Sequence, residues 1–239
     1  MNTALIFAGG TGQRMNTNAK PKQFLELHGK PIIIYTLEHF EKHHEIDNIV
    51  VVCIESWISE LEHLLEQYHF EKVRQIVPGG EGGDKSIYKG LLALEDTNCA
   101  PDDIILIHDG VRPLINNELI SKNIKAALEY GVAITIDNAT ESIVRLNEDG
   151  IISEVPPRAD MYMAKAPQSF KYKIVLDLYK RAQLDGHRTV DSAHLCNIYG
   201  VEMHTIRSTP NNIKITSPTD YYIFRALFEI RENEQILGM

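Results

Sequence analysis

The residues best suited to chemistry lie near the amino terminus, where the run AGGTGQRM at positions 8–15 is followed by Pro21-Lys22-Gln23. Glycine has no Cβ, so backbone N–H groups in such a loop can approach phosphate oxygens closely. Arg14 adds a planar guanidinium and Lys22 a point charge, and triphosphate sites commonly use both. This segment therefore predicts a phosphate-binding loop.

The loop matches neither of two common phosphate-binding patterns. The pattern GxGxxG is broken because Arg14 and Met15 stand where the third glycine would fall, and no Lys-Ser/Thr pair follows the second glycine. A glycine turn by itself is often only a tight turn, but the two nearby cations favour a phosphate loop of a third kind. A nucleotide-dependent oxidoreductase, which would need the first pattern, is disfavoured.

A second group of chemical residues, HDGVRP at positions 108–113, follows an apolar run. Ligands of open α/β sheets bind beyond the carboxyl ends of the strands. There, Asp109 could hold Mg²⁺, which prefers one or two carboxylates plus substrate phosphates, and Arg112 could take a substrate phosphate. The alternative for Asp109 is a turn or helix cap. For His108 we expect a packed, hydrogen-bonded side chain rather than a ligand or base.

Two further cations, Arg158 and Lys214, stand alone in the second half of the chain. Arg158 follows a pair of prolines, and Lys214 lies in a short extended piece over residues 212–216. Each by itself reads as ordinary solvated charge, which is the usual case.

Apolar runs and helical periodicity predict the elements that must position these residues. Strands are expected at 3–8, 48–54, 73–77, 103–107, 132–136 and 201–206, and helices at 32–40, 59–67, 85–94, 120–129, 170–183 and 221–231. Strands alternating with helices indicate an α/β fold with a Rossmann-like, mostly parallel sheet. The β-branched run at 48–54 lacks polar alternation, which is typical of a strand covered on both faces, so helices are expected on both faces.

The alternation of strands and helices changes after Gly131. Residues 141–146 and 151–155 read as the two limbs of a hairpin with turn chemistry at 147–150, and two prolines follow. We expect an arm over about 139–160 that projects from the sheet, and such arms often exchange with a second subunit. A plain surface hairpin is the equal alternative. The whole chain, 1–239, is otherwise of the size expected for one domain.

Composition excludes several classes of protein. The chain has 239 residues, 44% of them hydrophobic and 24% charged, and its net charge is -9. Nucleic-acid binding is disfavoured because it needs a basic footprint. Three separated cysteines, Cys53, Cys99 and Cys196, fit neither a disulfide scaffold nor a zinc site and favour the cytoplasm. We expect no signal peptide, because the apolar run after Met1 lacks a basic n-region and a cleavage site. We expect no membrane insertion, because no apolar stretch reaches the ~18 residues of a spanning helix.

Together these pieces resemble a known family, the cytidylyltransferases of sugar-alcohol (alditol) phosphates. The matching motifs run in family order over nearly the whole chain: AGGTGQRM with PKQF, PGGEGGDKS, HDGVRPL, VPPR, APQSF, VDSA and NIKIT. The eight-residue step from Arg14 to Lys22, and Val111 before Arg112, are similar to the ribitol-phosphate branch. The methylerythritol-phosphate branch of isoprenoid synthesis is the alternative. The resemblance implies a nucleotidyltransferase that serves teichoic acid or capsule synthesis.

The resemblance also implies a role for each matching residue. CTP and an alditol phosphate would be the substrates, Mg²⁺ the metal beside Asp109, and a homodimer joined through the arm the assembly. Arg14, Lys22 and Lys214 would be catalytic. The alditol phosphate would be held by Asp109, Arg112, Asp191 and the partner's Arg158. The nucleotide would lie along Ala8, Gly9, Gly10, Thr11, Gly12, Gly79, Gly80, Gly82 and Ser86, with Ser86 the side-chain contact to the base.

Some positions differ from the family's usual pattern. Gly83 stands where an arginine is usual, Ala166 where a threonine precedes Pro-Gln, and Glu141-Ser142 where an Asp-Thr pair is usual on the arm. Gly83 is the one feature that favours a non-catalytic binding module, against which the retained cations count. The other differences lie where the alditol phosphate is expected, so they bear on the second substrate more than on the nucleotide.

Overall fold

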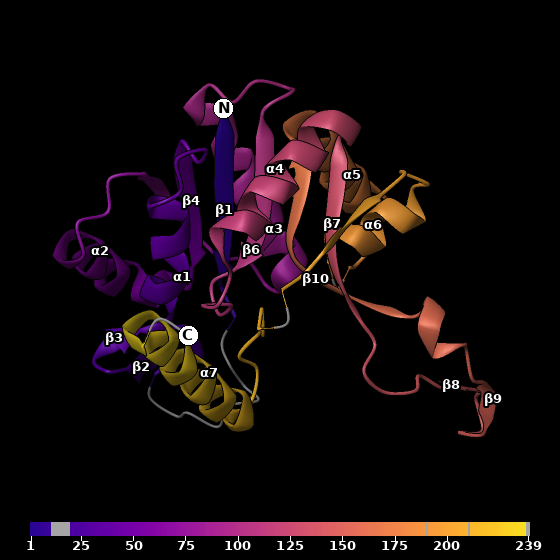
Figure 1. Cartoon of the computed structure of the whole chain (residues 1–239). Coiled ribbons are helices and arrows are strands. Elements are labelled where there is room, and N and C mark those ends of the chain that lie inside the picture. The colour runs from indigo at the N-terminus through magenta and orange to yellow at the C-terminus, as the bar shows by residue number, and fades with distance from the viewer. Residues whose placement is uncertain (11–19, 190, 210, 238–239) are drawn as a thin grey trace.

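The computed structural model describes residues 1–10, 20–189, 191–209 and 211–237, and its centre is a seven-stranded sheet (Figure 1). The strand order is β11-β7-β10-β6-β1-β4-β5. β1 pairs in parallel with β4 and β6, β4 with β5, and β7 with β11, whereas β10 runs antiparallel to β6 and β7. The bounds are β1 Asn2–Ala8, β4 Asn48–Cys53, β5 Val73–Pro78, β6 Ile104–Asp109, β7 Val132–Asn138, β10 Tyr162–Lys171 and β11 His204–Arg207.

Helices cover both faces of this sheet. Alternate strand residues point to opposite faces, and so Ile6 and Val51 belong to one apolar cluster and Leu5 and Val50 to another. The first cluster includes residues of α1 (Ile32–Glu41), α2 (Ile58–Gln67) and α4 (Asn117–Tyr130). The second includes residues of α3 (Gly83–Ala93), α5 (Tyr172–Asp185) and α6 (Ser192–Ile198). The expected α/β fold, with a Rossmann-like, mostly parallel sheet, is confirmed.

A third cluster lies beside the carboxyl edge of the sheet. There α7 (Pro218–Leu237) packs Phe224 against Leu27 and Tyr35, and Tyr221 donates a hydrogen bond to the Glu26 carbonyl at 2.6 Å. Two short strands, β2 (Glu26–Leu27) and β3 (Lys30–Pro31), form a separate small sheet, and the 3-10 turns are η2 Lys22–Phe24, η3 Glu55–Trp57, η4 Leu94–Thr97 and η5 Arg158–Asp160. In the described part of the chain, no helix combines the length and apolarity needed to cross a membrane.

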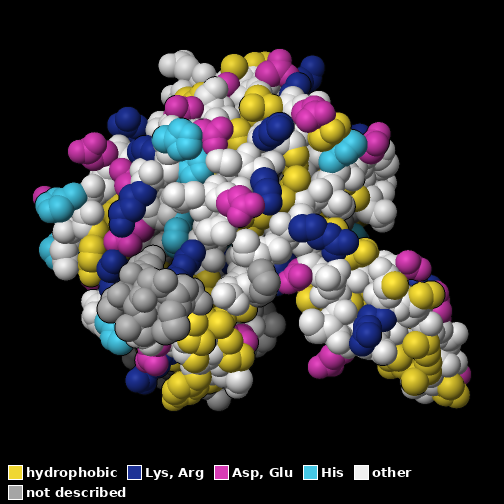
Figure 2. Space-filling model, in the orientation of Figure 1, with side chains coloured by type: hydrophobic (Ala, Val, Ile, Leu, Met, Phe, Trp, Pro, Cys, Tyr) yellow, Lys and Arg dark blue, Asp and Glu magenta, His cyan; other side chains and the backbone are white. Residues whose placement is uncertain are grey.

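A hairpin projects from the body between β7 and β10 (Figure 1). Its two strands, β8 (Arg145–Leu146) and β9 (Ile152–Glu154), are shorter than the expected limbs. Hydrophobic side chains gather on this arm (Figure 2): Leu146 is 54% exposed, Ile151 63%, Ile152 56% and Val155 59%. An arm this small has no core of its own to bury them.

Two sequence-based predictions of elements were wrong in this half of the chain. Phe170, expected to begin a helix, is the last but one residue of a ten-residue strand, and α5 begins at Tyr172. Pro167 argues against a central strand, but here it falls at a break in the β7–β10 ladder, between Ala164 and Gln168, where a missing N–H is tolerated. The last strand begins at His204 rather than Val201. The helix at 192–198, which Asp191 caps by accepting from the His194 N–H at 2.9 Å, was not predicted.

Candidate active site

Two glycine turns meet at the carboxyl edge of the sheet. Gly9 follows β1, and Gly79 follows β5. A Cβ placed on Gly79 would come within 3.5 Å of the Gly9 Cα and 3.3 Å of the Ser86 Oγ, and one on Gly9 within 3.2 Å of the same oxygen. A side chain at either glycine would therefore crowd this contact, which joins two predicted nucleotide-binding segments that are distant in the sequence.

The second turn, Gly79–Ser86, is held by its own serine. The Ser86 hydroxyl is fully buried, accepts from the Gly80 N–H at 2.9 Å and donates to the Gly82 carbonyl at 2.7 Å. Gly80 leaves no room for a side chain, since a Cβ would meet the Lys85 Cβ at 2.8 Å, and Gly82 caps α3 with a φ of 98°. Ser86 thus shapes the turn, and its contact with a nucleotide base stays a prediction.

The first turn is braced by a buried glutamine. Gln23 donates to the Ala8 carbonyl at 2.6 Å and is 1% exposed. Gly10 follows, and no atom of the described residues lies within 4 Å of a Cβ placed there. Thr11, Gly12 and Arg14 lie outside the described residues, so their predicted roles are not examined by the structure.

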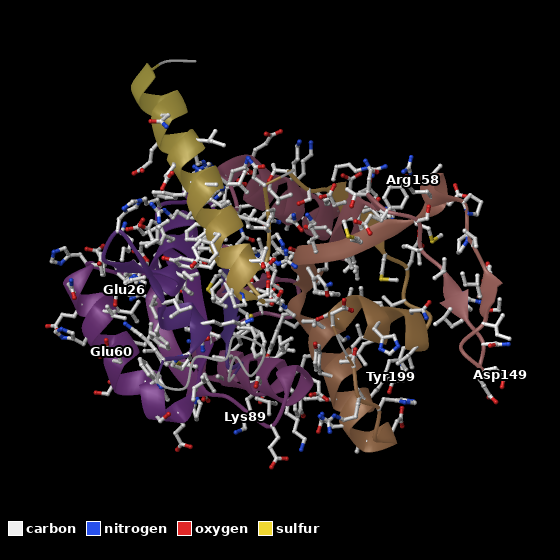
Figure 3. All side chains as sticks on the ribbon, turned by 90° about the horizontal axis from the view of Figure 1, so that it is seen from below. Glu26, Glu60, Lys89, Asp149, Arg158 and Tyr199 are labelled. Atoms are coloured by element: carbon white, nitrogen blue, oxygen red, sulfur yellow. The ribbon has the colours of Figure 1, made fainter. Side chains whose placement is uncertain are left out.

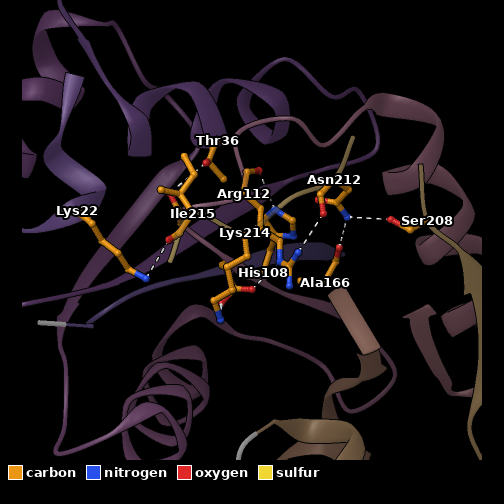
Figure 4. A network of polar contacts seen from close by, with 11 residues as sticks. Lys22, Thr36, His108, Arg112, Ala166, Ser208, Asn212, Lys214 and Ile215 are labelled. Carbon is orange, nitrogen blue, oxygen red and sulfur yellow. Dashed lines mark hydrogen bonds and ion pairs between the residues drawn. The ribbon is translucent and has the colours of Figure 1, made fainter. Parts of the chain in front are cut away.

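An ion-pair network lies at the end of β6 (Figure 4). One Asp109 carboxylate oxygen is 2.6 Å from the Lys214 ammonium, and the other accepts from the Arg112 Nε at 2.8 Å. Arg112 is buried, and its Nη1 also donates to the Asn212 carbonyl at 3.0 Å. The sequence-predicted residues Asp109, Arg112 and Lys214 are therefore in direct contact.

Charge and burial set the protonation states in this network. Burial would raise the pKa of Asp109, but the nearby Lys214 and Arg112 outweigh it and hold that pKa well below its ordinary value. His108, 1% exposed, has its pKa lowered to about 3, chiefly because burial disfavours the charged ring. Its Nε2 lies 3.4 Å from the Arg112 carbonyl. The expectation that His108 is a packed, hydrogen-bonded residue is confirmed.

Lys22 reaches the same region from the other side. It begins η2, and its ammonium donates to the Ile215 carbonyl at 3.1 Å (Figure 4). Ile215 follows Lys214 directly. Lys22 and Lys214, which are 192 positions apart in the sequence, therefore lie near each other at this edge of the sheet. Two amines and a buried guanidinium at this edge, with one carboxylate, are suited to gathering phosphate groups.

A pocket lies beside the ion-pair network, and residues of α3, β10 and the start of α6 complete its lining. Asp109, Arg112, Lys214 and Asp191 all line it, together with Gly83 of α3. Asp191 contributes from the start of α6. Among the described residues, a Cβ on Gly83 would touch only the Phe7 ring, at 3.8 Å or more, so this part of the wall has room for a larger side chain.

Arg158 does not join these residues within one chain. It is exposed in η5 on the arm, between the hairpin tip at Asp149 and the body (Figure 3), and it is not among the residues that line the pocket. The role predicted for it requires a second subunit and stays a prediction.

The described acidic residues fit only a metal ion for which the substrate phosphates supply most of the ligands. Among the described residues there is no group of three or more His, Cys, Asp or Glu side chains that could enclose an ion. Asp109 offers one carboxylate at the pocket, with Lys214 and Arg112 already on its oxygens. One carboxylate with substrate phosphates is an ordinary set for Mg²⁺. The residues therefore fit an ion carried mainly by a triphosphate, and do not fit a resident one.

Sequence reasoning missed two supports of this site. Asn212, fully buried, donates to the Ala166 carbonyl at 2.7 Å while its own carbonyl holds Arg112. It stands in the NIKIT motif but had no assigned role. Arg188 donates to the buried Asp84 at 2.8 Å and thereby ties the start of α3 to the segment before α6. No spacing rule could pair residues so far apart.

Comparisons with known proteins agree on one family. A family model described as "IspD: 2-C-methyl-D-erythritol 4-phosphate cytidylyltransferase" matches residues 2–230. A ribitol-5-phosphate cytidylyltransferase of Streptococcus agalactiae is 48% identical over the full length of both chains. A 2-C-methyl-D-erythritol 4-phosphate cytidylyltransferase of Clostridium botulinum is 35% identical, covering 95% of this chain and 97% of its own. The solved 4-diphosphocytidyl-2C-methyl-D-erythritol synthase of Anaerococcus prevotii is similar over 95% of both chains, with a TM-score of 0.82 and 26% identity.

Proposed function

Because the chain belongs to the 2-C-methyl-D-erythritol 4-phosphate cytidylyltransferase family, we propose that it condenses CTP with ribitol 5-phosphate to give CDP-ribitol and pyrophosphate. The observation that carries the choice of alditol is the 48% identity, over the full length of both chains, to a ribitol-5-phosphate cytidylyltransferase. The methylerythritol-phosphate relative is similar at only 35%. The chain is a nucleotidyltransferase on either reading.

The reaction needs charge neutralisation more than a base. A phosphate monoester at pH 7 is already an anion, so its oxygen can attack the α-phosphorus of CTP without prior deprotonation. A new P–O bond forms, the bond from the α-phosphorus to the bridging oxygen breaks, and that oxygen leaves with pyrophosphate. The protein must therefore hold two anions together and stabilise the added charge of the transition state.

The residues at the sheet edge are arranged for this task. The glycine turns at Gly9–Gly10 and Gly79–Gly80 receive the nucleotide, the first with its backbone close to the phosphates and the second beside the base. Lys22 and Lys214, from adjacent points of the edge, hold the α-phosphate, joined by Arg14. Arg112 and Asp191 receive the alditol phosphate, and Asp109 keeps both of its cations aimed at the pocket. Mg²⁺ brought with CTP, and held beside Asp109, would neutralise further negative charge.

The arm supplies the remaining cation in a homodimer. Arg158 cannot act on the pocket of its own chain from its exposed place on the arm, and the apolar side chains around it need a cover. We therefore place Arg158 in the second subunit's site, against the alditol phosphate. The main body would then be one nucleotidyltransferase domain over 1–239, with 139–160 an insertion, working in the cytoplasm toward teichoic acid or capsule.

The test is pyrophosphate release from CTP with four acceptors: ribitol 5-phosphate, methylerythritol 4-phosphate, erythritol 4-phosphate and glycerol 3-phosphate. We expect the largest kcat/KM with ribitol 5-phosphate. Release with none of the four would refute the ribitol assignment, and preference for methylerythritol 4-phosphate would replace it by the alternative. Turnover with ATP or GTP but not CTP would overturn the choice of nucleotide.

A further inference from the structure

Lys165 is a cation of the pocket that the reaction as described does not use. It lies in β10 and is among the residues that line the pocket, together with Asp109, Arg112 and Lys214. Only 13% of that side chain is exposed, and its ammonium is 2.7 Å from the Asp137 carboxylate of β7. A lysine so enclosed is uncommon unless it is paired, and Asp137 supplies the partner here.

The local backbone aims Lys165 at the edge where the chemistry lies. The ladder between β10 and β7 breaks between Ala164 and Gln168, and such irregularities re-aim side chains near active sites. On the other side, β10 pairs with β6 only as far as Gln168 and Ile107. Lys165 therefore stands beyond the end of that ladder, at the level where β6 finishes at Asp109.

The order of the strands separates two sides of the pocket. Both glycine turns follow strands on one side, β1 and β5, and Asp109 ends β6 beside them. β10 and β7 lie on the opposite side of β6, and the arm leaves from their ends. If the nucleotide occupies the glycine turns, the second substrate must enter over β10, where Lys165 is.

Arg112 has more partners than Lys165, whereas Lys214, like Lys165, is paired with one carboxylate. Arg112 uses its Nε on Asp109 and its Nη1 on the Asn212 carbonyl, and Lys214 is held by Asp109. An ammonium has three N–H donors in a rotatable group. With Asp137 on one of them, Lys165 retains donors that can turn to a ligand while the carboxylate keeps the group in place.

We propose that Lys165 binds the phosphate group of the alditol phosphate and so sets the affinity for the second substrate. The role rests on the proposed function, because it assumes that the glycine turns take CTP. Asp137 acts as a positioning residue, which holds the ammonium at the pocket wall and does not touch the substrate.

The test compares Lys165→Gln with the wild-type full-length enzyme under saturating CTP and then under saturating ribitol 5-phosphate. Removing one charged donor should raise KM for ribitol 5-phosphate about ten- to hundredfold. KM for CTP and the melting temperature should stay close to wild type. Lys165→Arg, which keeps the charge, should recover much of the loss. Lys180→Gln is the matched control, because Lys180 forms a similar pair with Glu95 outside the pocket.

Asp137→Asn separates substrate binding from a structural role. This variant keeps the Lys165 ammonium. If that ammonium contacts the substrate, the KM of Asp137→Asn for ribitol 5-phosphate stays well below that of Lys165→Gln. Equal rises in KM for Lys165→Gln and Asp137→Asn, with equal losses of melting temperature, would show that only the ion pair matters and would overturn the role. Wild-type turnover with an unchanged KM in Lys165→Gln would also overturn it, whereas absence of wild-type turnover would refute the proposed function itself.

Discussion

The two sides of the active-site edge are built from different materials. On the side of β1 and β5, the site is made of backbone: closely packed glycines, with a buried serine and a buried glutamine that hold the turns. On the side of β10 and β7, it is made of charged side chains and an exposed arm. Backbone recognition suits a constant triphosphate, whereas side chains can be exchanged to suit a different alditol.

The largest expected effect is at Lys22, which joins the two sides. Lys22→Ala should lower kcat by about 10²- to 10³-fold, by analogy with the loss of one transition-state donor. The fold should survive because Lys22 is only partly buried, at the site edge, where its ammonium donates to the Ile215 carbonyl. Initial rates of pyrophosphate release, with melting temperature as the control for folding, measure this. Near-normal turnover in a folded variant would remove Lys22 from the catalytic machinery.

Two histidines, His39 and His108, should control how the free energy of unfolding changes in acid. Burial lowers the pKa of His39 to about 4 and that of His108 to about 3, so both rings stay neutral in the folded protein. Below pH 6.5 the unfolded chain binds protons at these histidines and the folded chain does not, so the free energy of unfolding falls as pH falls. At pH 4 the loss from His39 alone would be about 3 kcal/mol at most, at 1.36 kcal/mol for each pH unit.

Asp109 should not contribute to that loss. Its pKa is depressed in the folded state, so its stabilising contribution is complete above the carboxyl's unfolded pKa and is lost only in stronger acid. Urea unfolding at pH 7, 6 and 5 measures the slope, and His39→Gln should flatten it. The same slope in wild type and His39→Gln would contradict the assignment to His39.

These cases show what the sequence could and could not predict. The sheet, its helices and the loop residues of the nucleotide side follow from apolar runs ended by glycines, signals that are local in the chain. The antiparallel strand β10 was mistaken because Pro167 opposes a strand, and the bulge that accommodates it depends on β7. Lys165, Asn212 and Arg188 owe their places to partners far along the chain, so no local pattern marks them.

The arm gives a smaller effect, on assembly. Ile152→Asp should weaken the proposed homodimer by about ten- to hundredfold in dissociation constant, since burying such a side chain contributes about 1.5–3 kcal/mol. Sedimentation over a range of protein concentrations measures it. Leu184→Asp is the control, because Leu184 is 86% exposed on α5, away from the arm. Equal dissociation for the two variants, or a wild-type monomer at all concentrations, would place the interface elsewhere or exclude it.

The division between the two sides is tested most directly by one set of initial rates, with CTP and ribitol 5-phosphate both varied, for wild type, Gly10→Ala and Arg158→Ala. Neither substitution should disturb the fold, because a Cβ on Gly10 meets no atom of the described residues within 4 Å and Arg158 is exposed. We predict that Gly10→Ala raises KM for CTP and leaves KM for ribitol 5-phosphate nearly unchanged, and that Arg158→Ala does the reverse. If both variants raise the same KM, or if the two effects are exchanged, the nucleotide and the alditol phosphate do not occupy the sides assigned to them.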